Sequence, residues 1–237
     1  MRALFYLSAL IAVLGFSACS GDENIRGRGN KETTIREVAN FDRIYLHHPA
    51  DVQVFKDTAF YIEMNDYNNL LPYIRTRLNG TTLIVDVAPN IDLHNSQTKM
   101  TIHLPSLYEL QISGSGEMDV YGNFSELNRA QISGSGRIAI EQLVHNSTFN
   151  AEISGSGNIK ANGQVNRLDS RISGSGKFDF LYLKSKEANV SISGSGTAYV
   201  NADQYLDAHI DGSGKVRYTG NPQLQVSISG SGTVQRY

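Results

Sequence analysis

The chain has 237 residues, of which 40% are hydrophobic, and it contains 22 glycines, 5 prolines and no tryptophan. This composition can fill a hydrophobic core and suits an all-β protein with many tight turns. The formal net charge of −2 at pH 7 excludes the strongly basic surface of a typical nucleic-acid-binding domain, so no nucleic-acid partner is expected. The single cysteine, Cys19, excludes an internal disulfide.

Residues 1–18 have the pattern of a secretory signal peptide. Arg2 is followed by an apolar run from Ala3 to Phe16 and then by small residues. The run is shorter than the roughly 20 apolar residues that a transmembrane helix needs. We therefore expect this segment to be absent from the mature protein.

Residues 16–19 read Phe-Ser-Ala-Cys and resemble a bacterial lipobox, in which the cysteine is lipidated and becomes the new N-terminus. Phe16 departs from the aliphatic residue that is usual there, and an ordinary signal peptide with an incidental cysteine is the alternative. The acidic pair Asp22-Glu23 resembles the surface-export signal of Bacteroidetes lipoproteins. We predict an outer-membrane lipoprotein displayed at the cell surface, held in the membrane by acyl chains, palmitate among them, on Cys19.

Residues 24–32 are polar, charged and glycine-bearing, which predicts a flexible tether within a lipidated segment over residues 19–33. Residues 34–105 then form a β segment without repeats. Asn79-Gly80 predicts a hairpin, and residues 66–73 predict a helical turn closed by Pro72. Alternation and β-branched or aromatic residues predict strands at 41–46, 51–55, 60–64, 74–78, 81–87 and 100–104.

Two further features concern single residues. Asp57-Thr58-Ala59 matches the O-glycosylation sequon of Bacteroidetes, so Thr58 is a candidate for modification. The six histidines show no metal-ligand spacing, and we expect the adjacent pair His47-His48 to be exposed and structural.

A five-residue phrase, Ile-Ser-Gly-Ser-Gly, recurs through residues 106–237 in six copies, with the variant Ile-Asp-Gly-Ser-Gly as a seventh. A fixed period of about 20 residues is the signature of a stacked solenoid. Counted from each isoleucine, even offsets are apolar or glycine and odd offsets are polar, which indicates strands with one buried face. The copies begin at Ile112, Ile132, Ile153, Ile172, Ile192, Ile210 and Ile228.

We therefore predict an all-β fold, a right-handed parallel β-helix or β-solenoid with turns of about 20 residues and an N-terminal β cap that contains a hairpin. Each isoleucine is expected to lie on the isoleucine of the next turn, with glycines at a corner and serines facing outward. Residues 46–54 match residues 112–120 at the apolar offsets, with the glycines lost. Residues 34–105 are therefore predicted to be the cap and degenerate first repeats.

The patterns that point to enzyme chemistry are weak. Gly-Ser-Gly-Lys at 174–177 lacks the earlier glycine and the Ser or Thr after lysine that a phosphate-binding loop needs. Asp119 and Asp179 lie three turns apart, about 14 Å at the strand spacing, which is too far for a pair of glycosidase carboxylates. We expect no catalytic, cofactor-binding or metal-binding residues.

Aromatic residues along the repeats are the better candidates for ligand contact, because flat rings stack on sugars and anchor protein contacts. The alternative, which is equally favoured, is that they cover the core at the turns. The candidates are Tyr121, Tyr182, Tyr199, Tyr205 and Tyr218.

Residues 41–237 resemble the head GIN domain family of auto-transporter adhesins, which is common in Bacteroidetes. The resemblance implies a β-helical secreted or surface domain and carries no catalytic motif to this chain. The residues that carry it, besides the repeated phrase, are Phe41-x-x-Ile44, Ala50-Asp51-Val52, Asn68-Asn69-Leu70-Leu71 and Asn79-Gly80-Thr81-Thr82-Leu83.

The sequence thus predicts a membrane-anchored, non-enzymatic adhesin or binding module for glycans or for proteins of a host or neighbouring cell. One alternative is a carbohydrate-active β-helix enzyme, which needs two acidic residues about 5–10 Å apart on one face. A second alternative is a structural homo-oligomer joined through an uncapped last turn at residues 228–237, because exposed strand edges invite pairing.

Overall fold

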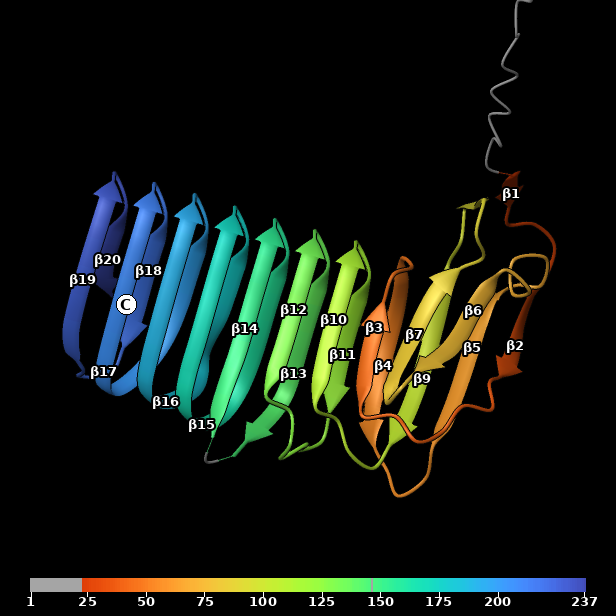
Figure 1. Cartoon of the computed structure of the whole chain (residues 1–237), viewed down its shortest axis with the longest axis horizontal. Coiled ribbons are helices and arrows are strands. Elements are labelled where there is room, and N and C mark those ends of the chain that lie inside the picture. Colours follow the sequence, from red (N-terminus) through yellow and green to blue (C-terminus); the bar gives the residue numbers. More distant parts are fainter. Residues whose placement is uncertain (1–22, 146) are drawn as a thin grey trace, which may run out of the picture.

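The strands of the chain stack into a long rod in the computed structural model, which describes residues 23–145 and 147–237 (Figure 1). The predicted signal peptide and Cys19 lie outside the described residues. No helix occurs in the described segments, so none there has the length and hydropathy to cross a membrane. The predicted all-β solenoid is confirmed.

Two stacks of parallel strands form the body of the rod. Stack I consists of β7 (Thr82–Val87), β3 (Arg43–Leu46), β10 (Glu109–Gly114), β12 (Arg129–Gly134), β14 (Thr148–Gly155), the second halves of β15 (Asn158–Gly174), β16 (Lys177–Gly194) and β17 (Thr197–Gly212), and β19 (Gln223–Gly230). Stack II consists of β9 (Thr98–Leu104), β4 (Ala50–Lys56), β11 (Glu117–Tyr121), β13 (Arg137–Val144), the first halves of β15, β16 and β17, β18 (Lys215–Thr219) and β20 (Thr233–Arg236).

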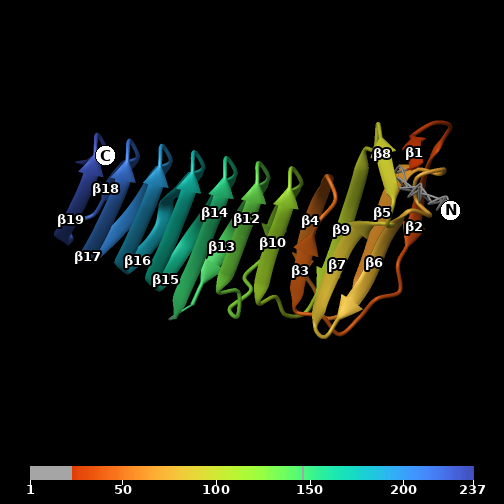
Figure 2. The ribbon, with the colours of Figure 1, turned by 45° about the horizontal axis from the view of Figure 1, so that its top comes forward.

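One strand of stack I, a Gly-Ser-Gly corner and one strand of stack II make a rung. The sharp corners line one long edge of the rod and wider bends line the other (Figures 1 and 2). Consecutive rungs pair without slippage at the repeated phrase, for example Ile172 with Ile192 and Ile192 with Ile210. The predicted isoleucine ladder is therefore confirmed, and burial of each side chain contributes roughly 1.5–3 kcal/mol.

The corner explains why the phrase needs two glycines. Gly194 has a φ of +123°, and a Cβ there would lie 2.5 Å from the carbonyl oxygen of Gly174 on the preceding rung. That oxygen accepts a hydrogen bond of 2.9 Å from the backbone N–H of Ser195. The second glycine, Gly196, is buried, and a Cβ there would lie 2.7 Å from Cγ2 of Ile172. The glycines therefore let successive corners touch through backbone atoms.

The first rung of the repeat pattern is β3 and β4, and it pairs with β10 and β11. Leu46 pairs with Ile112, and Val52 and Val54 pair with Met118 and Val120. Residues 46–54 are thus a degenerate repeat, as their apolar offsets predict. Before the chain reaches β10, it forms further strands, and two of these, β7 and β9, pair with the other side of β3 and β4. The chain then returns to form β10, which pairs with β3 on the side of the repeats.

Antiparallel strands close this end of the rod. β6 (Ile74–Asn79) pairs with β7 through a two-residue loop at Gly80 and Thr81, so the predicted hairpin is confirmed with its turn shifted by one residue. β5 (Tyr61–Tyr67) pairs with β9, and β2 (Lys31–Ile35) pairs with β5. The outermost strands of the cap are therefore β6 and β2.

One local prediction about this region is wrong, and another holds over a shorter range. The flexible tether predicted over residues 24–32 contains most of β1 (Glu23–Arg26), which pairs with β8 (Ile91–His94), and the start of β2. The helical turn predicted over residues 66–73 forms only after β5 ends at Tyr67, where the backbone N–H groups of Leu70 and Leu71 donate hydrogen bonds to the carbonyl oxygen of Tyr67. In the predicted tether, pairing with the distant strands β8 and β5 overrides the local polar pattern.

A buried polar cluster lies in the cap, and it corrects the expectation that His48 is exposed. The His48 side chain is 2% exposed, and its Nε2 lies 2.7 Å from Oγ1 of Thr98. Asp66 is fully buried and accepts hydrogen bonds from the Ser96 and Thr98 hydroxyls, both at 2.7 Å, and from the backbone of Tyr67. Burial raises the pKa of Asp66, but these hydrogen bonds outweigh it and hold the pKa below the ordinary value.

The corner geometry predicts a large effect of Gly194→Ala. The added methyl group meets the Gly174 carbonyl in a backbone conformation that alanine disfavours, so we expect a loss of about 2–4 kcal/mol in the free energy of unfolding. Urea denaturation followed by circular dichroism measures it. The control is Ser195→Ala at the same corner, where the exposed side chain predicts a change below about 0.5 kcal/mol. Equal losses in both variants would contradict the argument.

The Asp66 cluster predicts a pH-dependent stability. Because its folded-state pKa is lowered, the carboxylate stabilises the fold fully above its ordinary pKa, and this contribution is lost as the pH falls through the folded pKa. Asp66→Asn should reduce the free energy of unfolding by about 2–4 kcal/mol at pH 7, with a smaller difference below about pH 4. Urea midpoints from neutral to acid pH test this, with the exposed Asp51→Asn as control. A difference that stays constant with pH would count against it.

Candidate functional site

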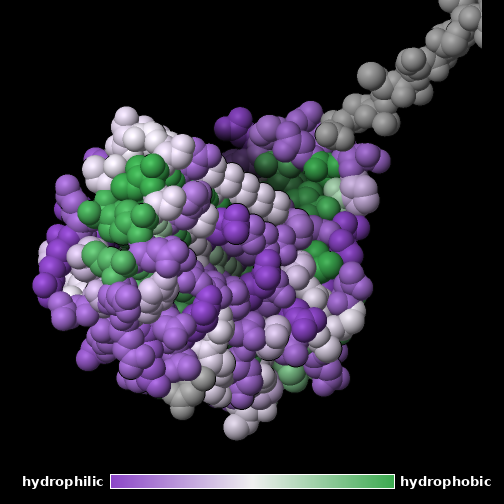
Figure 3. Space-filling model, turned by 60° about the vertical axis from the view of Figure 1, so that its left-hand side comes forward, coloured by the Kyte–Doolittle hydropathy of each residue, from purple (hydrophilic) through white to green (hydrophobic). Residues whose placement is uncertain are grey.

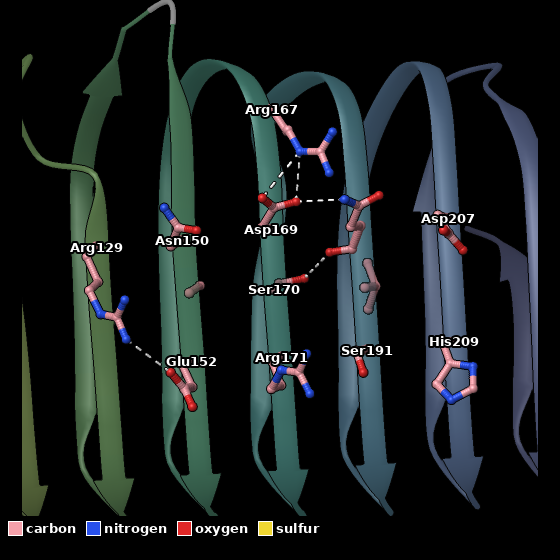
Figure 4. Close-up of a pocket in the computed structure, with 13 residues that line it drawn as sticks. Arg129, Asn150, Glu152, Arg167, Asp169, Ser170, Arg171, Ser191, Asp207 and His209 are labelled. Atoms are coloured by element: carbon pink, nitrogen blue, oxygen red, sulfur yellow. Dashed lines mark hydrogen bonds and ion pairs between the residues drawn. The ribbon is translucent and has the colours of Figure 1, made fainter.

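A shallow hollow of about 480 Å³ lies on the outer face of stack I, over β12, β14, β15, β16 and β17 (Figure 4). These strands alternate buried apolar residues with outward polar ones, so the face of the hollow is formed by polar side chains of successive rungs. Its polar and charged lining residues are Arg129, Asn150, Glu152, Arg167, Asp169, Ser170, Arg171, Asn189, Ser191, Asp207 and His209.

Strand register arranges the floor of the hollow in rows that run along the rod. Arg171 pairs with Ser191 and Ser191 pairs with His209, so the small serine stands between two long side chains. Neighbouring strands are about 4.8 Å apart, which leaves about 10 Å between the Arg171 and His209 backbones. Figure 4 shows the three residues at one level on successive strands. The short side chain of Ser191 opens the hollow.

A chain of ion pairs leads into the hollow from the capped side. Glu109 lies 3.8 Å from Arg43 and 3.3 Å from Arg129, measured between charged atoms. Arg129 also reaches Glu152 at 3.3 Å. These charges come from β3, β10, β12 and β14, and they hold one another in place. They therefore form a fixed wall of the hollow.

A second ion-pair network lies at the wider-bend side. Arg167 contacts Asp169 at 3.0 Å and Glu187 at 3.2 Å, and the Asn189 side chain donates a hydrogen bond of 2.8 Å to Asp169. The stacked strands thus bring two carboxylates around one guanidinium group on one face. The separation of Asp119 and Asp179 does not reveal this cluster, because both of those residues lie on stack II. The guanidinium group between the two carboxylates compensates both charges.

Three ionisable side chains of the hollow have no hydrogen bond or ion pair to any other described residue: Arg171, Asp207 and His209. Arg171 and His209 are exposed, and Asp207 is half-buried. All three project from paired strands, so their positions are fixed by the stack. Together they offer a strong donor, an acceptor and an imidazole that serves as either. The hollow can therefore bind a polar ligand that carries both donors and acceptors.

The five candidate tyrosines are not brought together. Tyr182 is 72% exposed, while Tyr218 packs against the core at the end of β18. Tyr199 lies on stack II under Lys177, with the ammonium group 5.0 Å from the ring centroid. Tyr205 lies on stack I and donates a hydrogen bond to Gln225. Only Tyr182 presents most of its surface to a partner.

The fifth tyrosine, Tyr121, belongs to an aromatic ladder that the sequence did not reveal as a unit. Its ring stacks on Phe55 with centroids 4.9 Å apart, and Phe55 stacks on His103 at 5.2 Å. Tyr61 meets His103 edge-on at 5.8 Å. The alignment of residues 46–54 with residues 112–120 extends by one residue and then matches Phe55 with Tyr121, which pair in the structure. This alignment could have predicted the stacking of the two rings from the sequence. Because the rings cover one another's faces, the ladder favours structure over ligand stacking.

The remaining candidates are the predicted glycosylation site Thr58, the predicted lipidation site Cys19 and any group of metal-ligating side chains. Thr58 is exposed in the loop between β4 and β5, and its backbone N–H donates a hydrogen bond of 2.6 Å to Asp57. Cys19 lies outside the described residues. Within the described ranges, no three His, Cys, Asp or Glu side chains are grouped closely enough to hold a metal ion.

Solved structures share this fold. A "Putative lipid binding protein" from Parabacteroides distasonis is 26% identical with a TM-score of 0.77, and the alignment covers 91% of this chain and all of that one. A "putative adhesin" from Bacteroides fragilis is 22% identical with a TM-score of 0.82, over 90% of this chain and 100% of that one. Another from Parabacteroides merdae is 22% identical with a TM-score of 0.75, over 90% and 99%.

No curated protein matches the chain significantly. The model of one protein family matches residues 40–222, which include β3 to β18 and the whole of the polar hollow. The match spans well over half of the sequence and agrees with the resemblance carried by the Ile-Ser-Gly-Ser-Gly phrase. The chain therefore belongs to the family described as "Putative auto-transporter adhesin, head GIN domain".

Proposed function

We propose that this protein is a non-enzymatic adhesin of the bacterial outer envelope, and that it binds its ligand through the hollow on stack I. The observation that carries the proposal is the set of fixed but unpaired groups, Arg171, Asp207 and His209, on the floor of an open polar surface. Because the paired strands already hold the backbone of these residues in register, only their side chains lose conformational freedom on binding. The family description supports an adhesive role.

A polyhydroxylated glycan is the ligand class that these groups fit best. Sugar hydroxyls both donate and accept hydrogen bonds, so they can satisfy Arg171 and Asp207 at the same time. The name of the P. distasonis protein raises lipid binding as another possibility. The polar lining favours a polar ligand over an acyl chain, because burying charged groups against a hydrocarbon chain is costly.

A carbohydrate-active enzyme is less well supported. A glycosidase acid needs a raised pKa and its partner a free carboxylate, as in the two-carboxylate mechanism. Here Asp169 and Glu187 both pair with Arg167, at 3.0 Å and 3.2 Å, so neither is a free carboxylate. The same residues serve better as a rigid wall of a binding surface.

The proposed anchor determines which end of the rod lies near the membrane. Cys19 precedes the first residue of β1, Glu23, by four positions, which an extended chain spans in at most about 14 Å. A lipid on Cys19 would therefore keep the capped end near the outer membrane and leave the last rung free to extend away from it. In this orientation the hollow on stack I faces sideways and is open to soluble or cell-bound glycans.

Glycan and matrix-protein arrays probed with the soluble chain from Ser20 onward, which keeps every described residue, test the proposal. We expect Arg171→Ala and Asp207→Asn each to weaken binding of an identified glycan about tenfold, because each removes a charged hydrogen-bonding group. The matched control is Arg217→Ala, which removes an exposed arginine from stack II. Titration calorimetry measures the affinities.

The outcomes separate the possible sites. Loss of binding in Tyr182→Ala with no effect of Arg171→Ala would move the site from the hollow to the exposed ring. Equal losses in Arg171→Ala and Arg217→Ala would indicate general attraction by positive charge. No binding on either array, together with protein that proteases cannot reach on intact cells, would overturn the adhesin proposal.

A further inference from the structure

The last rung exposes side chains that every earlier rung buries. Ile228 is 42% exposed, whereas the isoleucines at the same position from Ile112 to Ile210 are 0% exposed. Val226 is 44% exposed and its counterpart Ala208 is 0% exposed. Leu224 is 43% exposed, while Leu206 is fully buried. Figure 3 shows apolar groups on this end of the rod, bordered by hydrophilic side chains.

The edge strands of this rung lack the usual protection against pairing. β19 pairs only with β17 and β20 only with β18 among the described strands. β19 has the sequence QLQVSISG, without a charged residue. The single charge of β20, Arg236, is directed onto the carbonyl oxygen of Gly220 at 2.9 Å. An uncharged edge strand with apolar neighbours is a ready template for another strand.

The opposite end of the rod is built differently. There the outermost strands are antiparallel additions to the solenoid, and they carry charge: Lys31 and Glu32 on β2, and Arg75 and Arg77 on β6, which both pair with Asp86 of the neighbouring β7. Such charges discourage edge-to-edge pairing. The capped end therefore does not complement the open one.

We propose that a second copy of this chain binds to the last rung, so that two rods join end to end through β19 and β20. Since the capped end is protected, the surface that matches the apolar rung is the same rung of another copy, which gives a two-fold symmetric dimer. A two-fold axis across the rods makes each new strand pair antiparallel. Because β19 is uncharged, this self-pairing brings no like charges together.

The size of the contact sets its strength. β19 has 8 residues and β20 has 4, in two layers about 10 Å apart, so the end face buries on the order of 800 Å² between two copies. This is the size of a weak, transient interface. Main-chain hydrogen bonds along β19 add to the buried apolar area. The dimer is therefore reversible and depends on protein concentration.

Sedimentation velocity of the soluble chain from Ser20 onward, over a wide range of concentration, tests the proposal. The wild-type chain should shift from monomer to dimer as the concentration rises, and Val226→Glu should remain monomeric. Val226 is already half-exposed, so the charge is tolerated in the monomer, and an unchanged circular-dichroism melting curve verifies the fold. The matched control is Ile35→Glu on β2 at the capped end, where Ile35 is 60% exposed; it should dimerise as the wild type does.

Cross-linking tests the symmetry. The soluble chain has no cysteine, so Gln225→Cys places one thiol on β19 and Thr33→Cys places one on β2. A short bismaleimide should link Gln225→Cys into dimers and leave Thr33→Cys unlinked. Monomers at every concentration, a series of species larger than dimers, dimers that persist in Val226→Glu, or cross-links only in Thr33→Cys would each overturn the proposal.

Discussion

Backbone contact between successive Gly-Ser-Gly corners is the constraint on which the rest of the rod depends. The N–H of Ser195 donates to the carbonyl oxygen of Gly174 at 2.9 Å, and equivalent bonds of the same length occur along the ladder of corners. A side chain at Gly194 would separate the two rungs. Because the corners fix the register, each isoleucine lies on another isoleucine and each outward side chain has a defined neighbour. The polar hollow and the ion-pair networks on stack I both follow from that register.

The sequence predicts the repeating part of the fold well, because register there is encoded in every rung. Even the degenerate rung could be aligned, since Leu46 and Val52 keep the apolar offsets without the glycines. The spatial order at the capped end could not be predicted. β7 and β9 pair beyond β3 and β4 through long-range contacts that no repeated phrase records. For the same reason, the polar residues of β1 and β2 indicated a tether, although distant strands order them.

The candidate site was harder to predict than the fold. The sequence gives the outward residues of each strand, and their alignment places Arg171, Ser191 and His209 in one row. Whether such a row forms a hollow depends on side-chain size on three rungs at once and on which charges pair with one another. Arg129 and Arg167 are held by carboxylates, whereas Arg171 is not. That difference arises from diagonal contacts between rungs, which a comparison at single offsets does not include.

The two proposals combine into a statement about where adhesion acts. With the proposed lipid on Cys19, the capped end would lie at the membrane and the open rung at Ile228 would lie at the distal end of the rod. A two-fold axis across that rung places the two anchors at opposite ends of the doubled rod. Two chains anchored in one flat membrane cannot readily meet in this way, but chains on two facing cells can. End-to-end pairing therefore favours contact between cells that carry the same protein, while the hollow on stack I stays free for a different ligand.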